Sequence, residues 1–402
     1  MLIASLLSAE EIEYDNVPDL ADVNITCQLL ESFGAKISRT SNHSLKISVP
    51  SLIATEASYA LVKSIRASFW ILGPLLARGG AARVALPGGD IIGARPVNMH
   101  LDALTQMGAD IKIKNGVVFA TAQAGLKPQD IKFDFPSVGA THQVLLAASL
   151  TEGVSTITGA AREPEVIALA ELLNQMGAEI SGAGESKITI KGKSSLGSAK
   201  VSLIGDRIEA ASYLLSAAVT QSKLKVEGFN PKHLGGFLDI MDEIGMNPEI
   251  GEDFVQVDVK SRIKAIEVET SPFPGLATDI QAPLMAALCY ADGKSIINET
   301  IFEGRFGHVS ELCRMGAKIK VKGNLAIIEG VENLVGAPVQ ANDIRAAAAL
   351  LIAALSAEGK TTVSEVHHFK RGYERIDEKF NSLGANVHFV PEDAEDYILT
   401  GC

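Results

Sequence analysis

The segment LAELLNQMGAEI at residues 169–180 carries the pattern that decides the fold: an amphipathic stretch, a glycine that is usually followed by alanine, then alternating apolar residues. A glycine at such a point is typical of a helix C-terminus, and the alternation after it is typical of a half-buried strand. The segment therefore predicts a helix, a turn at Gly177 and a strand. The pattern occurs five more times, in LLESFGAKI (29–37), LDALTQMGADI (101–111), LDIMDEIGMNPEI (238–250), LCRMGAKI (312–319) and FNSLGANV (380–387).

A second phrase precedes each copy of this pattern. It is a helix of small apolar residues that leads through a short turn into a β-rich stretch, as in HQVLLAASLTEGVSTI at 142–157 and AAALLIAALSAEGKTTV at 347–363. Because that helix is apolar all round, we expect it to be buried. Short strands such as IKFDF at 131–135 stand before it. Each repeat therefore reads as βαβαββ, and the chain as an α/β protein of six repeats of about 70 residues.

The length of 402 residues exceeds what one hydrophobic core usually serves, which favours two domains. Three repeats in each predict a first domain at residues 1–204 and a second at 205–402. We expect the fourth repeat to begin near residues 199–205. By comparison with the third repeat, the first lacks its opening strand and a helix N-terminus, so we expect about a dozen residues to be missing or replaced there.

Composition excludes several classes of protein. With 47% apolar residues the chain is an ordered globular protein, and its net charge of -12 argues against broad binding of nucleic acid or anionic membranes. The four cysteines, Cys27, Cys289, Cys313 and Cys402, lack disulfide or zinc spacing and read as reduced thiols. No signal peptide or membrane-spanning stretch is recognisable, so we expect a cytoplasmic protein without membrane insertion.

The starts of the small-residue helices are the first candidate for chemistry. A helix N-terminus exposes unpaired N–H groups and the positive end of a dipole, which attract anions. Polar or charged residues stand there in Lys63–Ser68, Ser137–Thr141, Asp206–Arg207, Thr278–Asp279 and Asn342–Arg345. Plain helix capping explains any one of these equally well, but charge in most repeats favours a phosphate site.

The segment LPGGDIIGARPVNMH at residues 86–100 is the second candidate. Gly88 and Gly89 permit unusual backbone geometry and motion, Asp90 can carry a proton, and Arg95 can hold a phosphate bidentately. Taken alone, a PGGD sequence is more often only a turn.

Seven motifs, in order and spacing, resemble the UDP-N-acetylglucosamine 1-carboxyvinyltransferase family over nearly the whole chain. They are VKSIRASFWILGPLLAR (62–78), LPGGDIIGARPV (86–97), SVGATHQVLLAASLTEG (137–153), AAREPEV (160–166), TDIQAPLMA (278–286), ETIFEGRFGHV (299–309) and HHFKRGYERID (367–377). The sister family, which makes 5-enolpyruvylshikimate 3-phosphate, shares the fold but should lack GARPV and RGYERID in this form.

The resemblance implies a two-domain inside-out α/β barrel of the EPSP synthase-like type. It also implies transfer of the enolpyruvyl group of phosphoenolpyruvate to the 3-hydroxyl of UDP-N-acetylglucosamine by addition and elimination, the first committed step of peptidoglycan synthesis. The implied partners are these two small molecules, with no nucleic acid and no metal or organic cofactor.

The resemblance further implies the roles of individual residues. Asp279 would be the general base and Asp90 the acid. Four arginines, Arg66, Arg95, Arg345 and Arg371, would surround the phosphate and carboxylate of phosphoenolpyruvate or close the site. The capping alternative for Asp279 and Asp343 stays open. The substrate-binding positions implied are Arg66, Arg95, Pro96, Val97, Asn98, Met99, Phe135, Pro136, Ser137, Val138, Asp279, Ile301, Arg305, Asp343 and Arg345.

Two departures from the family pattern concern the chemistry. Many members have a cysteine where this chain has Asp90. An aspartic acid must be protonated to donate, so we expect domain closure and a neighbouring phosphate to keep it so. Without a thiolate, the covalent adduct and alkylation by the epoxide fosfomycin should both be absent.

The second departure is the expected missing start, where the family has a Lys-Asn pair that touches phosphoenolpyruvate and the first strand of the second domain. A mis-annotated start, a fragment and an impaired paralogue are the three interpretations. The non-enzyme alternative is a sugar-nucleotide-binding or regulatory paralogue, and a 3-phosphoshikimate 1-carboxyvinyltransferase is a further one. The histidines, including His100, His142, His367 and His368, lack metal spacing and are expected to be structural.

Overall fold

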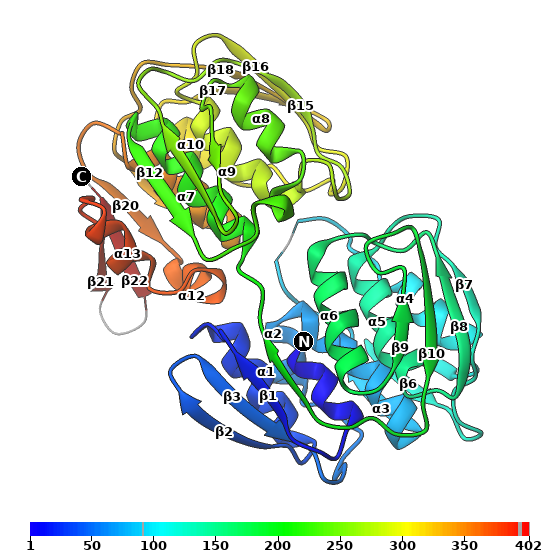
Figure 1. Cartoon of the computed structure of the whole chain (residues 1–402). Helices are drawn as coiled ribbons and strands as arrows, with labels where there is room; N and C mark the ends of the chain where they lie inside the picture. Colours follow the sequence, from blue (N-terminus) through cyan, green and yellow to red (C-terminus); the bar gives the residue numbers. More distant parts are fainter. Residues whose placement is uncertain (91, 393–395, 402) are drawn as a thin grey trace. The chain divides into compact units, whose positions relative to one another are not determined.

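The structure is a computed structural model that describes residues 1–90, 92–392 and 396–401, and side chains as far as residue 390. The chain divides into two compact units (Figure 1). Unit 1 comprises Met1–Gly89 and Pro96–Ile204, and unit 2 comprises Asp90–Arg95 and Gly205–Cys402. The short segment Asp90–Arg95, from the loop singled out in the sequence, therefore packs with unit 2.

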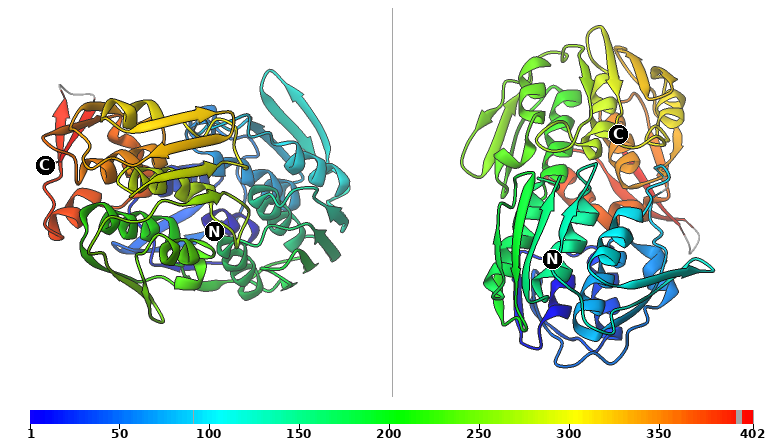
Figure 2. Two further views of the ribbon diagram at one scale, coloured as in Figure 1. Left: turned by 90° about the horizontal axis from the view of Figure 1, so that it is seen from above. Right: turned by 90° about the vertical axis from the view of Figure 1, so that its right-hand side faces the viewer.

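Unit 1 contains three open sheets, in the orders β11-β1-β3-β2, β4-β6-β5 and β7-β8-β10-β9. Their alternating burial, as in Lys187–Gly192, shows one face towards the core and one towards solvent. The β5–β6 hairpin extends from the rest of its unit (Figure 2). The strands are β1 (Ile12–Asp15), β2 (Lys36–Ser41), β3 (Ser44–Ser48), β4 (Ala81–Ala85), β5 (Asp110–Lys114), β6 (Val117–Thr121), β7 (Asp130–Lys132), β8 (Gly153–Thr158), β9 (Glu179–Ser181), β10 (Lys187–Gly192) and β11 (Ala199–Ser202).

The helix α5 of unit 1 is buried along most of its length. In α5 every residue from Ala140 to Ser149 is buried, the polar Thr141, His142 and Gln143 included, which confirms the expected burial of this helix; it packs against α3 and α4. The helices are the 3₁₀ helix η1 (Leu2–Leu7), α1 (Ala21–Ser32), α2 (Tyr59–Ser64), the 3₁₀ helix η2 (Arg66–Ile71), α3 (Leu72–Gly79), α4 (Asn98–Gln106), α5 (Val138–Ser149) and α6 (Pro164–Gln175).

Unit 2 repeats the plan with sheets in the orders β12-β14-β13, β15-β16-β18-β17 and β19-β20-β22-β21. Among the described residues the first of these sheets has no parallel strand beside β12. The strands are β12 (Lys223–Glu227), β13 (Glu249–Ile250), β14 (Phe254–Asp258), β15 (Glu267–Glu269), β16 (Lys294–Asn298), β17 (Lys318–Lys322), β18 (Leu325–Glu329), β19 (Pro338–Gln340), β20 (Thr361–Ser364), β21 (His388–Glu392) and β22 (Asp396–Gly401).

Three buried helices of unit 2, α7, α9 and α11, pack against one another. All but the first residues of α9 and α11 are buried, which confirms the prediction for the small-residue phrases. The helices are α7 (Arg207–Thr220), the 3₁₀ helix η3 (Pro231–Leu234), α8 (Phe237–Glu243), α9 (Thr278–Leu288), α10 (Val309–Arg314), α11 (Ile344–Ala354), the 3₁₀ helix η4 (Val366–His368), α12 (Phe369–Gly372) and α13 (Ile376–Ser382).

The repeats predicted from the sequence are present. The glycine of each copy has a positive φ, between 87° and 111°, which ends its helix as the C-cap interpretation requires. In four sheets the opening strand runs parallel to the next: β7 beside β8, β11 beside β1, β15 beside β16, and β19 beside β20.

One expectation about the repeats is wrong. The strand near residue 199 does not open the fourth repeat, because β11 pairs in parallel with β1, from Ile12 opposite Ala199 to Asp15 opposite Ser202. It therefore supplies the opening strand that the first repeat was expected to lack. The division into domains at 1–204 and 205–402, with the second lacking its first strand, stays a prediction.

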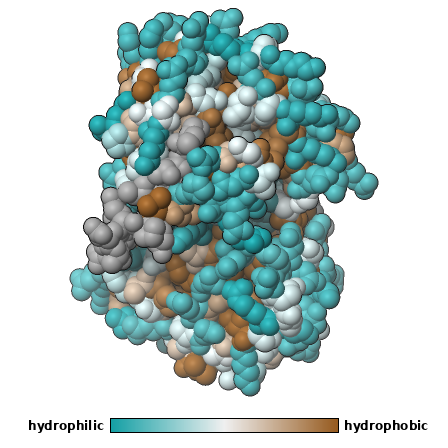
Figure 3. Space-filling model, turned by 90° about the vertical axis from the view of Figure 1, so that its left-hand side faces the viewer, coloured by the Kyte–Doolittle hydropathy of each residue, from teal (hydrophilic) through white to brown (hydrophobic). Residues whose placement is uncertain are grey.

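The surface seen in Figure 3 is polar over most of its area, with hydrophobic residues in small patches. In the described part of the chain, no helix is both long and apolar enough to cross a membrane. Cys27, Cys289 and Cys313 are free thiols, and Cys402 lies outside the described residues.

Candidate active site

Two of the buried helices in unit 2 begin with polar residues singled out in the sequence. Asp279 is the second residue of α9. Asp343 precedes α11, and its Oδ1 accepts hydrogen bonds from the backbone N–H groups of Arg345, at 2.7 Å, and Ala346, at 2.9 Å. Asp343 is therefore an N-cap, as one interpretation of the sequence held, and its role in binding stays a prediction. The cap fixes the start of the helix that carries Arg345.

Asp279 forms ion pairs with two arginines from different elements. Its Oδ1 lies 2.7 Å from Arg305 Nη2, and its Oδ2 lies 3.0 Å from Arg345 Nη2. The Arg305 side chain is only 4% exposed, whereas that of Asp279 is 39% exposed, so the carboxylate lies at the accessible side of the cluster. A solvent-accessible carboxylate held by two fixed guanidinium groups is well placed to meet a substrate.

The charges of this cluster depend on one another. Burial raises the pKa of Asp279, but Arg345 and Arg305 outweigh burial, so this pKa lies well below the usual range of a carboxylic acid. Burial lowers the pKa of Arg345, and Asp279 more than reverses this effect. Asp279 is therefore ionised at pH 7.

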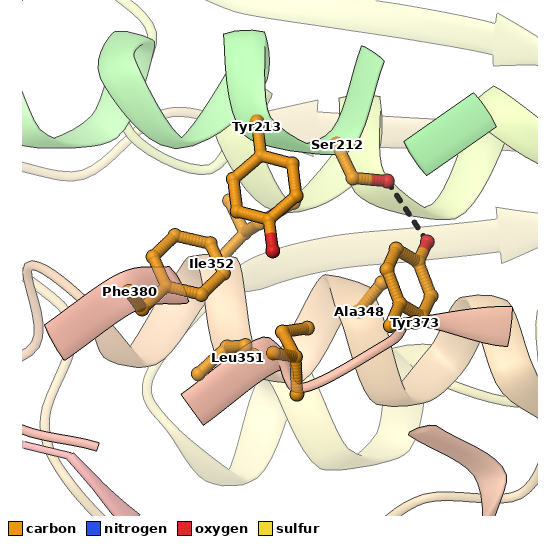
Figure 4. A pocket seen from close by; sticks show the side chains of 8 residues that line it. Ser212, Tyr213, Ala348, Leu351, Ile352, Tyr373 and Phe380 are labelled. Atoms are coloured by element: carbon orange, nitrogen blue, oxygen red, sulfur yellow. Dashed lines mark hydrogen bonds between the residues drawn. The ribbon is translucent and has the colours of Figure 1, made fainter. Parts of the chain in front are cut away.

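Arg345 is hydrogen-bonded to a chain of two hydroxyl groups, those of Tyr373 and Ser212. Its Nη1 donates to the hydroxyl of Tyr373 at 3.4 Å, and that hydroxyl lies 2.9 Å from Ser212 Oγ (Figure 4). Ser212 Oγ in turn donates to the backbone carbonyl of Ile208 at 2.9 Å. With Ser212 as a donor there, Tyr373 donates to Ser212 and accepts from Arg345. The adjoining cavity of about 10 Å³ has room for about one water molecule and for no substrate.

Asp90 forms an ion pair with Arg371 inside unit 2. Asp90 Oδ1 lies 2.7 Å from Arg371 Nη1, and both side chains are largely buried, at 17% and 15% exposed. His368 Nδ1 lies 4.0 Å from the same oxygen. The predicted acid and a predicted phosphate ligand are thus in direct contact.

Arg95 lies in the same cluster with an unusual backbone. Its φ is 42°, although a residue before proline normally has an extended backbone. Its Nη1 donates to the backbone carbonyl of Asp90 at 3.3 Å, and its guanidinium lies 5.5 Å from the centre of the Phe302 ring. Burial, followed by Arg305 and Arg371, lowers its pKa against the opposing effects of Asp90 and Asp279. Arg95 therefore shares one electrostatic cluster with both predicted catalytic carboxylates.

The loop before Arg95 is held by Glu303. Oε1 of Glu303 accepts from the backbone N–H of Ala94 at 3.1 Å. Gly93, with φ 141°, approaches so closely that a Cβ there would lie 2.8 Å from Glu303 Oε2. Close packing thus fixes the conformation around Gly93, and the mobility of the loop stays a prediction.

Ile301 follows β16 in unit 2, and the remaining predicted residues lie in unit 1, at the starts of three helical elements. Arg66 begins η2, Pro96–Met99 lead into α4, and Phe135–Val138 lead into α5. The side chain of Ser137 caps α5 by accepting from Ala140 N–H at 3.3 Å. A Cβ at Gly139 would lie 2.9 Å from the ring of His100, in α4, so the starts of α4 and α5 meet at this glycine.

Buried histidines lie close to these unit 1 residues. Burial lowers the pKa of His100 to about 4, helped by the charge of Arg66, and lowers the pKa of His142 to about 3. His142 lies edge-on to Trp70, with ring centres 4.8 Å apart. Both histidines are neutral at pH 7 and fill the core, as the structural interpretation of the sequence held.

Several residues of the unit 2 cluster were missed by sequence reasoning. They are Phe302, Tyr373 and Glu299. Arg207 was among the charged residues singled out at helix starts, and its charge helps to lower the pKa of Asp279. Tyr373 and Phe302 lie inside the quoted motifs, but only the fold shows what they contact. In the described part of the chain, no three His, Cys, Asp or Glu residues are grouped to hold a metal ion.

Comparisons with known proteins identify the family of this chain. Residues 1–380 match the family model of EPSP synthase (3-phosphoshikimate 1-carboxyvinyltransferase). The UDP-N-acetylglucosamine 1-carboxyvinyltransferase of Shewanella woodyi is 47% identical over 388 residues, which cover 96% of this chain and 93% of the relative. That of Trichlorobacter lovleyi is 45% identical over 390 residues, with 97% and 93% covered.

Solved structures confirm the predicted fold class. The enolpyruvyl transferase NikO from Streptomyces tendae superposes with a TM-score of 0.87 at 25% identity, covering all of this chain and 93% of its own. An EPSP synthase from Acinetobacter baumannii, at 20% identity, TM-score 0.67 and coverage of 90% and 88%, shares the fold. From the family model and the relatives above, this chain belongs to the EPSP synthase family and, within it, to the UDP-N-acetylglucosamine 1-carboxyvinyltransferases.

Proposed function

We propose that this chain transfers the enolpyruvyl group of phosphoenolpyruvate to the 3-hydroxyl of UDP-N-acetylglucosamine and releases phosphate, in the cytoplasm, as the first committed step of peptidoglycan synthesis. The observation that carries the proposal is the cluster in unit 2, where Asp279 lies between Arg305 and Arg345. Arg95 and Arg371 add positive charge to the same cluster. An excess of guanidinium groups around an accessible carboxylate suits an anionic substrate that must meet a base.

The proposed reaction assigns a proton transfer to each carboxylate. Asp279 removes the proton of the sugar hydroxyl as its oxygen bonds to C2 of phosphoenolpyruvate, and Asp90 donates a proton to C3. The C2–O bond to phosphate then breaks, C3 loses a proton, and the enol ether forms. The arginines stabilise the carboxylate and the departing phosphate. Of the unit 1 residues, Pro96–Met99 and Phe135–Val138 are proposed to bind the sugar nucleotide, and Arg66 is proposed to bind phosphoenolpyruvate.

Asp90 must carry a proton to act as the acid, yet it is paired with Arg371 in the structure. The proposal therefore requires Arg371 to give up its ion pair with Asp90 and to bind the phosphate or carboxylate of phosphoenolpyruvate instead. Asp90 can then act as the acid. Asp90→Asn removes the acid and leaves the shape, so kcat should fall by roughly a hundredfold. Full activity of this variant in a pH titration would remove Asp90 from the mechanism.

The test of the function is phosphate release by the 402-residue chain with phosphoenolpyruvate and either UDP-N-acetylglucosamine or shikimate 3-phosphate. Release with the sugar nucleotide alone is expected. Release with the shikimate ester alone would assign the chain to the sister activity. If neither gives release but calorimetry shows UDP-N-acetylglucosamine binding, the chain is a binding paralogue.

A further inference from the structure

Glu299 is a buried carboxylate that none of the proposed chemistry uses. It directly follows β16 and is only 1% exposed. Its Oε1 accepts from Thr270 Oγ1 at 3.0 Å, Ile301 N–H at 2.9 Å and Phe302 N–H at 3.1 Å, and its Oε2 accepts from Thr278 Oγ1 at 3.0 Å. All four donors are neutral. A buried carboxylate is retained only where such hydrogen bonds compensate its lost hydration.

Two of the segments that Glu299 joins carry predicted site residues. Thr278 begins α9 and directly precedes Asp279. Ile301 is a predicted sugar-nucleotide position. The ring of Phe302 faces two guanidinium groups, with Arg95 at 5.5 Å and Arg305 at 5.8 Å from its centre. The Glu299 side chain thus holds the start of α9, which carries the proposed base Asp279. It also holds the Ile301–Phe302 loop, in which Phe302 contacts two arginines.

Ser295 in β16, the strand that Glu299 follows, is a buried residue whose hydrogen bond is purely structural. Ser295, which is fully buried, accepts from the backbone N–H of Ile266 at 3.2 Å. This hydrogen bond connects β16 with the residue just before β15. In the same way, the hydrogen bond between Glu299 and Thr270 connects the residue just after β16 with the residue just after β15. Ser295 has no recorded hydrogen bond to a predicted site residue. Substitutions at Ser295 and Glu299 therefore distinguish an effect on the stability of the sheet from an effect on the arrangement of the site.

We propose that Glu299 is a positioning residue, which sets Asp279 and the Ile301–Phe302 loop in their working arrangement; this inference rests on the proposed function. Its two oxygens accept four donors at once, which a single amide oxygen does not match. Displacing a base or a binding group by about 1 Å costs roughly a hundredfold in rate. Glu299 thereby acts on catalysis without touching the substrates.

The first part of the experiment compares Glu299→Ala with Ser295→Ala as the matched control. Glu299→Ala leaves two backbone N–H groups without an acceptor, so kcat/KM should fall by roughly ten- to a hundredfold, with a higher KM for UDP-N-acetylglucosamine. Glu299→Gln retains one acceptor oxygen and should recover most of this loss. Ser295→Ala should keep its activity. Equal losses in Glu299→Ala and Ser295→Ala, or none in Glu299→Ala, would overturn the inference.

The second part of the experiment measures the order of the Ile301–Phe302 loop by hydrogen exchange, which does not depend on catalytic activity. Amide hydrogen exchange of Ile301 and Phe302 should speed up at least tenfold in Glu299→Ala and stay unchanged in Ser295→Ala, while the amides of β16 keep their protection. If the unaltered chain releases no phosphate, the proposed function fails, and this exchange alone decides the inference about Glu299. Unchanged protection of both amides would then refute it.

A milder variant covers the case in which Glu299→Ala does not fold. Thr278→Val removes only the hydrogen bond next to Asp279 and keeps the side-chain shape. It should lower kcat several-fold with little change in KM, and Ile301 and Phe302 should stay protected. An unaltered kcat in Thr278→Val would contradict a positioning role of Glu299 towards Asp279.

Discussion

The two units are built on one plan but treat charge at their buried helices differently. In unit 2 the first residues of the buried helices are charged and paired: Asp279 with Arg305 and Arg345, and Asp206 with the backbone N–H groups at the start of α7. In unit 1 the corresponding helix α5 is capped by the neutral Ser137.

Unit 1 buries two histidines in their neutral form close to its predicted substrate-binding residues, as unit 2 does with His308, where burial lowers the pKa to about 4. His100 and His142 are each 6% exposed, and burial is the largest influence on the pKa of both. The same scaffold thus holds charge only where a partner of opposite sign or a set of hydrogen-bond donors meets it. We infer that unit 2 supplies the acids, bases and guanidinium groups of the reaction, and that unit 1 supplies Arg66 and neutral contacts.

The largest expected effect breaks the paired charges of unit 2. Asp279→Asn removes the base but can keep the shape of the cluster, so kcat should fall by roughly 10²- to 10⁴-fold. The KM for phosphoenolpyruvate should stay level or fall, because Arg305 and Arg345 lose their counter-charge. Steady-state phosphate release measures both constants.

The matched control for this change is Asp206→Asn, at the start of α7. Asparagine caps a helix about as well as aspartate does, so both the melting temperature and kcat should stay near those of the unaltered chain. A kcat within tenfold of the unaltered chain for Asp279→Asn would show that Asp279 only orders its arginines.

Much of this difference between the units could be predicted from the sequence, because it depends on local patterns. The turn glycines and the uniformly apolar helices follow from contacts a few residues apart, and Asp279, Asp343 and Arg345 stand at helix starts that those patterns locate. The position of Arg207 followed from the same rule, although its part in the Asp279 cluster did not.

The remainder depends on contacts between distant parts of the chain. The pairing of β11 with β1 joins residues 187 positions apart, and no local pattern distinguishes it from the start of a fourth repeat. Glu299 and Tyr373 likewise have distant partners, since Thr278 lies 21 residues from Glu299 and Ser212 lies 161 residues from Tyr373. A buried hydrogen-bond network leaves no periodic signal in the sequence, so the fold is needed to find it.

The second largest effect concerns the neutral histidines of unit 1. The pKa of His142 in the folded chain is about 3, against about 6.5 for an unfolded histidine. Between these values the unfolded chain binds a proton that the folded chain does not. The stabilisation is therefore complete above pH 6.5 and is lost as the pH falls towards 3, by roughly 2 to 3 kcal/mol at pH 4.5.

His142→Leu should flatten this dependence. Urea unfolding at pH 7.0 and pH 4.5 measures it, and His367→Leu, at an exposed position, is the control. The difference in unfolding free energy between the two pH values should shrink in His142→Leu alone. An unchanged difference would mean that unit 1 accommodates a charged histidine, and the contrast between the units would then be weaker than proposed.

A smaller effect tests the support behind Arg345 in unit 2. Tyr373→Phe removes the hydroxyl between Arg345 and Ser212 and keeps the ring, which lies 5.9 Å from the guanidinium. We expect kcat/KM to fall by about tenfold, because Arg345 loses one of two groups that orient it.

The control for that variant is Tyr290→Phe. It removes a buried hydroxyl of the same unit that donates to the carbonyl of Ala353 at 2.7 Å. Both variants should lose similar stability, so a larger loss of kcat/KM in Tyr373→Phe would isolate the effect on Arg345. Equal activities would reduce Tyr373 to a packing residue.

The smallest effect compares the helix caps of the two units directly. Asp206 Oδ1 accepts from Ile208 N–H at 2.7 Å and Glu209 N–H at 3.2 Å, whereas Ser137 accepts one bond of 3.3 Å. Asp206→Ala should therefore lower the unfolding free energy by about 1 to 2 kcal/mol, and Ser137→Ala by about 0.5 kcal/mol. Urea unfolding in low and in 1 M salt distinguishes their origins. Salt should shrink only the Asp206 effect, since a charged cap interacts with the helix dipole and a hydroxyl cap does so little. Equal salt dependence would mean that the charge of Asp206 adds nothing to its hydrogen bonds, and that the two units differ at these helix starts in geometry alone.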